Sequence, residues 1–227
     1  MTKTKTKAAE KPPEIEFFYD IPQRSEEWFD LRRGIPTASK FAAVMAQGKN
    51  GDESQTRQGY MNELVGEIIS GLTEETFRSE AMRRGVAMEP IARDYYASKR
   101  FDEVVEIAFA RRRLPSGRFI GASPDAQVGG RAARKGLEIK SVKQAEMVAL
   151  RNAAAGGFPP RFKWQLHGTL LVTGWEEIDL LVYSENMGGL EFTIVRDEHK
   201  CRELHDALEV FDYDLHDLVR RTRERMA

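Results

Sequence analysis

The spacing of apolar side chains predicts a series of amphipathic helices. Between residues 54 and 70 they recur at intervals of three and four positions, at Met61, Leu64, Val65, Ile68 and Ile69. This spacing places them on one face of a helix, which Gly71 ends. Capping residues and similar spacing predict further helices over 25–33, 37–46, 79–99, 143–155, 160–172 and 198–227, with a kink at Pro90.

Short runs rich in β-branched residues predict the strands, over residues 104–110, 118–128, 136–143, 177–184 and 190–196. The segment GGRAARKG joins the second and third strands as a loose hairpin, and ENMGG separates the last two. The order of the elements predicts an α/β fold with a central mixed β-sheet flanked by α-helices. We expect one domain over residues 14–227, preceded by a disordered Lys/Thr-rich tail at 1–13.

The composition is that of a water-soluble protein and excludes the disordered and membrane classes. Hydrophobic residues make up 41% and charged residues 31%, and no apolar run approaches the ~18 residues that a spanning helix needs. The single cysteine, Cys201, has no partner for an intrachain disulfide. We therefore expect a cytoplasmic location and no association with a membrane.

Positive charge is gathered locally, although the net charge is −1. Arginines cluster in LRRG, AMRRG, ARRRLPSGR and RAARKG, whereas EVFDYDLHD is acidic. This layout suits a protein with one basic groove, and solvated charged faces explain each cluster about equally well. The histidines have no ligand-like spacing, so we expect them on the surface or on helix faces: His167, His199, His205 and His216.

Residues 121–144, GASPDAQVGGRAARKGLEIKSVKQ, place two carboxylates and an amine around the predicted hairpin. Side chains alternate along a strand, so Glu138 and Lys140 share a face and Ile139 points to the other. Asp125 lies on the partner strand, where pairing in register brings it close to Glu138. Two adjacent carboxylates repel unless a cation lies between them, and all-oxygen ligands favour Mg²⁺, or Mn²⁺ in its place, over Zn²⁺. With Lys140 holding or deprotonating a water, the group predicts phosphodiester hydrolysis.

The SPD…LEIK pattern resembles the PD-(D/E)xK nuclease superfamily. Further segments extend the resemblance to the phage lambda exonuclease family, also called the YqaJ-like viral recombinase family: EEWFDLRRGIPTASKF, RRGVAMEP and WQLHGTLLVTG. They occur in the family's order and cover almost the whole chain. The resemblance implies that the α/β fold has a restriction-endonuclease-like core.

The resemblance also implies roles for individual residues. Asp125, Glu138 and the backbone carbonyl of Ile139 would bind metal. Glu89 would serve a second ion, directly or through water. Gln165 would form a hydrogen bond with the catalytic water or the scissile phosphate. Many relatives with this core have Gln-x-x-x-Tyr, whereas this chain has a threonine at the tyrosine position, which puts the role of that position in doubt.

The segment LRRGIPTAS predicts a second pocket, for a phosphate group. Arg32 offers a bidentate guanidinium, and Thr37 and Ser39 offer hydroxyls and free N–H groups at a helix N-terminus. In the resembled family these residues, with the serine that matches Ser123, hold the 5′-terminal phosphate of DNA. Without the resemblance, an N-cap and a surface arginine would be the simpler interpretation.

The resemblance implies a Mg²⁺-dependent exonuclease that degrades one strand of double-stranded DNA from 5′-phosphorylated ends, releasing 5′-mononucleotides and leaving 3′ overhangs. It also implies a homotrimer, a single-strand annealing protein as partner, and a phage or prophage origin. Two alternatives stay open. A PD-(D/E)xK endonuclease or structure-specific resolvase would cut closed circles, and a non-catalytic DNA-end-binding protein would not need Lys140.

Overall fold

A computed structural model describes residues 14–48, 54–73, 80–153 and 157–227, and the predicted tail at 1–13 lies outside these ranges. The strands are β1 (Ile15–Phe18), β2 (Val104–Val105), β3 (Phe109–Arg113), β4 (Phe119–Ala122), β5 (Ala126–Val128), β6 (Lys135–Ser141), β7 (Glu177–Ser184) and β8 (Gly188–Val195). The α-helices are α1 (Glu26–Arg32), α2 (Phe41–Val44), α3 (Gln55–Ser70), α4 (Glu80–Arg100), α5 (Gln144–Arg151), α6 (Lys163–Thr173) and α7 (Glu198–Met226). Two 3₁₀ turns are η1 (Ala38–Lys40) and η3 (Pro160–Phe162).

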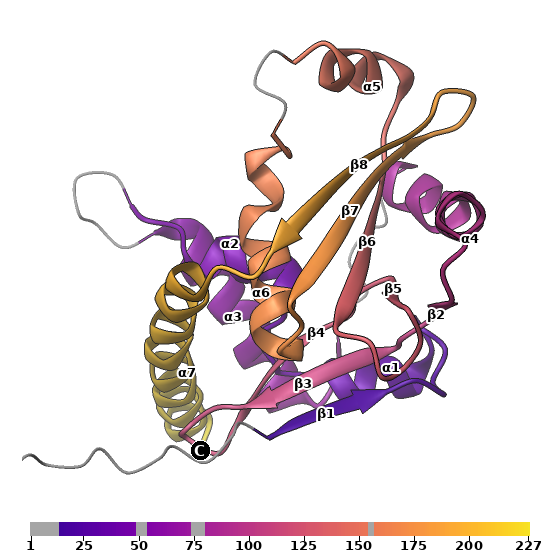
Figure 1. Ribbon diagram of the computed structural model, residues 1–227. Coiled ribbons are helices and arrows are strands. Elements are labelled where there is room, and N and C mark those ends of the chain that lie inside the picture. Colours follow the sequence, from indigo (N-terminus) through magenta and orange to yellow (C-terminus); the bar gives the residue numbers. More distant parts are fainter. Residues whose placement is uncertain (1–13, 49–53, 74–79, 154–156) are drawn as a thin grey trace, which may run out of the picture.

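Two sheets organise the described part of the chain (Figure 1). The larger sheet has the order β2-β5-β6-β7-β8, in which β6 and β7 run parallel and the other neighbours are antiparallel. The smaller sheet, β1-β3-β4, is antiparallel throughout. Helix α4 packs on one face of the larger sheet and α6 on the other. The predicted central mixed sheet flanked by helices is therefore confirmed.

Two of the predicted strands are each divided between the sheets, which the hydrophobic pattern did not indicate. Residues 104–110 form β2 and the start of β3, and residues 118–128 form β4 and β5. Pro124 lies at the second division, where it has no N–H to donate to a ladder. Gln23 ties the two divisions together, because its Nε2 donates to Ile107 O at 2.8 Å and to the Pro124 carbonyl at 3.2 Å. Strand β1 was not among the predicted strands.

The helices follow the apolar spacing except where other contacts interrupt them. Helix α3 ends at Gly71 in a left-handed conformation, as predicted, and the structure adds Ser54 as its N-cap. The helix predicted at 37–46 is instead η1 followed by one turn of α-helix, because a β-bridge to Gly121 holds Thr37 in an extended conformation. The helix predicted at 143–155 ends at Arg151.

Gly121 on β4 makes room for the ring of Phe109 and also forms a hydrogen bond with the loop before η1. A Cβ atom at this position would be 2.1 Å from Cζ of Phe109, so any other residue would displace that ring. The Gly121 N–H donates to Pro36 O at 2.9 Å. The loop that carries Thr37 is thereby held close to the end of β4, where Ser123 follows.

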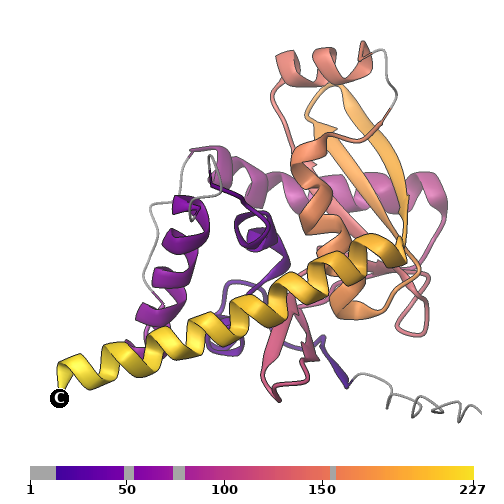
Figure 2. The ribbon, with the colours of Figure 1, turned by 90° about the vertical axis from the view of Figure 1, so that its left-hand side faces the viewer.

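Most apolar side chains form one core between the larger sheet, α3, α6 and α7. Helix α7 contributes a stripe at helical spacing: Cys201, Leu204, Leu208, Phe211, Leu215 and Val219. It crosses the outside of the molecule, and its C-terminal end extends beyond the other elements (Figure 2). None of the described helices is both long enough and apolar enough to cross a membrane.

A smaller core holds α4 on the opposite face of the sheet, with a buried charge at its edge. Asp179 is fully buried on β7 and accepts hydrogen bonds from Tyr96 Oη at 2.5 Å and Thr193 Oγ1 at 2.6 Å. Lys135 Nζ lies 3.0 Å from the same carboxylate. These partners compensate the buried charge and tie α4 to three neighbouring strands.

His167 differs from the other histidines, because it is buried on the inner face of α6. Its Nδ1 has no hydrogen-bond partner among the described residues. Burial, with the nearby charge of Lys200, lowers the pKa of His167 to about 4. The ring is therefore neutral in the folded protein at neutral pH.

We expect His167→Gln to reduce the acid sensitivity of the fold. In the wild type the folded-state pKa lies below the unfolded value, so this contribution to stability is complete above about pH 6.5 and is lost as the pH falls toward about 4. The loss amounts to up to about 3 kcal/mol. Urea unfolding across this range measures it, with His199→Gln as the exposed control. Parallel curves for wild type and His167→Gln would contradict the role.

Candidate active site

Asp125 is fixed at the point where the chain enters the larger sheet. Its N–H donates to Leu137 O at 3.1 Å, and its Oδ2 accepts a hydrogen bond from the Ile139 N–H at 2.6 Å. Because Ala126 pairs with Leu137, these bonds place the Asp125 carboxylate beside Glu138. The register assumed from the sequence is the one observed.

Glu138 points from β6 toward α6 and is 3% exposed. Its Oε1 accepts hydrogen bonds from Lys140 Nζ at 2.7 Å and Gln165 Nε2 at 2.5 Å. Its Oε2 is buried and has no partner among the described residues. Thr169, one helical turn after Gln165, is buried. The hairpin and α6 thus bring together Asp125, Glu138, Lys140 and Gln165.

The charged groups at this point lie close enough to affect one another strongly. Burial raises the pKa of Asp125 well above its usual range, and the carboxylates of Glu138 and Glu89 raise it further. Burial lowers the pKa of Lys140, but attraction to Glu138 and Asp125 outweighs this effect and the pKa is raised overall. Lys140 is therefore a protonated donor in this structure, which favours holding a water or phosphate oxygen over accepting a proton.

Glu89 reaches the same region from α4, where it is 9% exposed. Its Oε2 accepts a hydrogen bond from Arg24 Nη2 at 2.5 Å, and its Oε1 accepts one from Arg93 Nη2 at 3.0 Å. Sequence reasoning did not identify either arginine. Arg93 lies one helical turn after Glu89, a spacing that could have indicated this pair. Nothing local indicated Arg24.

These groups fit a hard divalent cation. The Oε2 of Glu138 lacks a partner, and the charged form of Asp125 is unfavourable. A cation between the two carboxylates would bind this oxygen of Glu138 and would stabilise the charged form of Asp125. Both residues offer the oxygen ligands that such a cation prefers. The Ile139 N–H is already donated to Asp125, and the carbonyl of Ile139 is the third candidate ligand. Glu89 would have to leave its arginines to bind a second ion directly.

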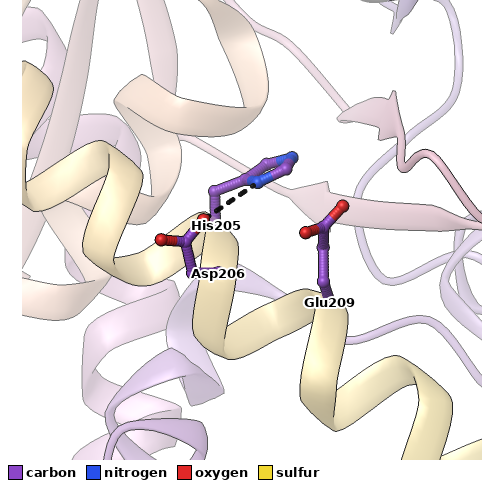
Figure 3. A group of neighbouring side chains, drawn as sticks. All are labelled: His205, Asp206 and Glu209. Atoms are coloured by element: carbon purple, nitrogen blue, oxygen red, sulfur yellow. Dashed lines mark ion pairs between the residues drawn. The ribbon is translucent and has the colours of Figure 1, made fainter.

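Another group of potential metal ligands lies on α7, at His205, Asp206 and Glu209 (Figure 3). All three side chains come from adjacent turns of one helix, and Asp206 is exposed. Exposed acidic groups are common without a bound ion. Among the described residues, none of these three has a buried oxygen or nitrogen without a partner, unlike Glu138.

Arg32, at the end of α1, forms a second charged site. Its Nη1 donates to Ser123 Oγ at 2.6 Å, and its guanidinium lies 4.1 Å from the ring centre of Trp28. It forms no ion pair with any carboxylate in the described ranges. Burial lowers the pKa of Arg32 to about 10, so it stays charged at neutral pH. A partly buried guanidinium without a counter-ion suits a phosphate group.

Helix α3 holds the loop beside Arg32. The Thr37 N–H donates to Tyr60 Oη at 2.9 Å, and the Gly34 N–H donates to Glu67 Oε2 at 2.8 Å. The N–H of Thr37 that was expected to be free is therefore occupied. The hydroxyls of Thr37 and Ser39 lie 3.4 Å apart, and Ser39 is exposed. Tyr60 and Glu67 were missed from the sequence, although their spacing of seven puts them on one helix face.

The two-sheet fold and the carboxylate group define an α/β protein of the PD-(D/E)xK class, with a restriction-endonuclease-like core. Residues 27–176 match the family described as the YqaJ-like viral recombinase domain. The chain belongs to this family, as the sequence motifs predicted.

Comparison with solved structures gives the same fold. An alkaline exonuclease from Laribacter hongkongensis is similar at 28% sequence identity and a TM-score of 0.76, over 89% of this chain and 100% of that one. That enzyme has also been solved in complex with dAMP. A phage-related exonuclease from Haemophilus somnus 129PT matches at 11% identity and a TM-score of 0.58, over 85% of this chain and 96% of that one, which shows the fold alone. A comparison with curated proteins gives no match.

We expect Mg²⁺ to stabilise the protein without DNA, because a cation bound between Asp125 and Glu138 would balance their charges in the folded state. At an ion concentration of about 100 times Kd, the gain is about 2.7 kcal/mol. Asp125→Asn should abolish the rise in melting temperature, whereas Asp206→Asn, in the α7 group, should not. Thermal unfolding in EDTA, Mg²⁺ and Mn²⁺ measures this. A rise that survives Asp125→Asn but not Asp206→Asn would move the ion to α7.

Proposed function

We propose that the protein is a Mg²⁺-dependent exonuclease, with Mn²⁺ as a substitute, that degrades one strand of double-stranded DNA from a 5′-phosphorylated end. It would release 5′-mononucleotides and leave 3′ overhangs. Family membership and the similarity to an alkaline exonuclease support a nuclease role. The observation that carries the proposal is the buried Oε2 of Glu138 beside Asp125 and Lys140, for which the described ranges offer no hydrogen-bond partner.

The neighbouring Arg32 supports action at a DNA end. Ser123, which accepts a hydrogen bond from Arg32, precedes Asp125 by two residues, which span at most about 7 Å of chain. This length is comparable with the separation of adjacent phosphates in a DNA strand. A terminal phosphate on Arg32, with the hydroxyls of Thr37 and Ser39 beside it, would place the next phosphodiester near the carboxylates.

Each protein group near the carboxylates has a separate task in this proposal. A Mg²⁺ ion on Asp125, Glu138 and the Ile139 carbonyl would lower the pKa of a bound water and neutralise phosphate charge. Lys140, protonated beside Glu138, orients the attacking water or a phosphate oxygen. Gln165 donates its amide N–H to the same oxygen atoms when it leaves Glu138.

The assembly and setting are proposed from the family alone. We propose a homotrimer that encloses the DNA and hands the 3′ overhang to a single-strand annealing protein. The protein would be phage- or prophage-encoded and act in the bacterial cytoplasm. Glu89 would serve the second ion, directly or through water.

We expect Lys140→Met to lower kcat by about 10²-fold or more while duplex binding persists, because the ammonium acts on the reacting oxygen atoms and not on the rest of the DNA. Lys99→Met, an exposed lysine on α4, is the control. Single-turnover rates and binding in EDTA separate the two effects. Weakened binding with normal turnover of the bound complex would contradict the role, and an unaltered function would support a non-catalytic end-binding protein.

We expect Arg32→Gln to reduce the preference for 5′-phosphorylated over 5′-hydroxyl duplex by about 10- to 100-fold, the value of a charged hydrogen-bonded pair. Arg33→Gln, the adjacent arginine that pairs with Asp30, is the control. Rates on the two linear duplexes and on closed circular DNA measure this. An unchanged ratio would refute the phosphate pocket, and cutting of closed circles by the wild type would favour an endonuclease.

A further inference from the structure

A cavity of about 570 Å³ lies at the turn end of the β5–β6 hairpin. Its size is within the range of small-molecule sites. Ile15 and Phe17 of β1 form part of its apolar wall. Its charged lining is mostly basic: Arg112, Arg131, Arg134, Arg196 and a single carboxylate, Glu198. None of the residues assigned above to metal or terminal phosphate lines it, so it is separate from the proposed active site.

Arg112 is one of the four arginines that line this cavity. It stands in the run of three arginines on β3, whose other two members form ion pairs: Arg111 with Glu16 and Arg113 with Glu14. Side chains alternate along a strand, so Arg112 points to the opposite face. It forms no ion pair with any residue that the structure describes, and the hydrogen bond observed for it goes to Leu171 O at 2.6 Å.

A second arginine is held next to it in the same way. Arg196 donates through Nη1 to Leu170 O, one residue before the carbonyl that Arg112 uses. Both guanidiniums therefore stabilise the negative end of α6, which accounts for one N–H of each. Burial, and then repulsion from Arg196, lowers the pKa of Arg112. Two fixed like charges at the wall of a cavity define a place for an anion, because the anion relieves the repulsion.

The other ion pairs around the cavity are weak competitors for such an anion. Arg131 pairs with Asp20, and Arg134 pairs with Glu176, and the carboxylate side chains are 89% and 68% exposed. The Arg196 partner, Glu198, is 69% exposed. Exposed pairs contribute little to stability, so these arginines can exchange a carboxylate for a ligand at small cost.

We propose that this cavity is a second binding site, for a phosphorylated nucleoside. The phosphate would lie on Arg112 and Arg196, which offer the planar forks that phosphate oxygens prefer. The sugar and base would lie against Ile15 and Phe17, since the volume far exceeds that of a phosphate alone. The ligand is either a free nucleotide or a nucleotide of a DNA strand that passes this end of the hairpin.

Calorimetric titration with dAMP in EDTA tests the site. We expect binding both at Arg32 and at this cavity in the wild type. Arg32→Gln should remove the first and leave the second, whereas Arg112→Met should do the reverse. Arg113→Met, on the other face of the same strand, should change neither. Deoxyadenosine, which lacks the phosphate, should not compete. Binding removed by Arg112→Met but untouched by Arg32→Gln would support this cavity while contradicting the proposed terminal-phosphate pocket.

A conservative variant keeps the test valid if Arg112→Met fails to fold. Arg112→Lys retains the charge and a donor for Leu171 O but loses the fork, and we expect dAMP to bind the cavity about tenfold more weakly. Unaltered dAMP titrations in both variants would overturn the proposal.

A hairpin-capped duplex without ends separates the two sources of the nucleotide. If the cavity takes a DNA strand, Arg112→Lys should weaken binding of this duplex and lower its salt dependence by about one phosphate contact. If it takes a free nucleotide, duplex binding should equal the wild type while dAMP binding is weakened. If Arg112→Lys binds both the duplex and dAMP as tightly as the wild type does, the proposed second site is wrong.

Discussion

One hydrogen bond, from the Ile139 N–H to the Asp125 carboxylate, sets the position of the first carboxylate of the candidate active site. It fixes a side chain at the edge of the sheet onto β6, next to Glu138. Bringing two carboxylates together in the interior is unfavourable unless they are compensated. Lys140 and Gln165 compensate one oxygen of Glu138, and the other oxygen has no partner in the described part of the chain. The remaining deficit of positive charge defines the place for a cation.

At Pro124 the chain passes from the smaller sheet to the larger one. This brings the deficit of positive charge at the carboxylates next to an excess of positive charge at Arg32. Ser123, just before the proline, contacts the guanidinium of Arg32, which pairs with no carboxylate of the described residues, and Asp125, just after the proline, is one of the clustered carboxylates. A surplus of positive charge and a surplus of negative charge therefore lie on either side of one residue. The proposed function would use both, with the guanidinium for a terminal phosphate and a bound cation for the phosphodiester to be cut.

The helices hold these charges from outside the sheets. Helix α3 uses Tyr60 and Glu67 to fix the loop beside Arg32, and α4 is tied to the larger sheet through Asp179. The cavity around Arg112 also contains incompletely compensated charge, but this charge is positive, whereas that of the carboxylates is negative. In each case the neighbouring side chains of the described residues leave part of the charge without a partner, and that deficit indicates the charge of the ligand.

The sequence by itself determined the main elements, the alternation of Glu138, Ile139 and Lys140 on β6, and the family to which the motifs belong. These features are local, because periodicity and short motifs report which face of an element is apolar or chemically active. It did not reveal that the chain changes sheets at Pro124, since the hydrophobic pattern is the same on both sides. Nor did it reveal which side chains neutralise Glu89, or that Arg112 forms no ion pair with any of the described residues. Only the tertiary structure decided these, because a charge is paired or unpaired according to burial and to groups brought from distant parts of the chain.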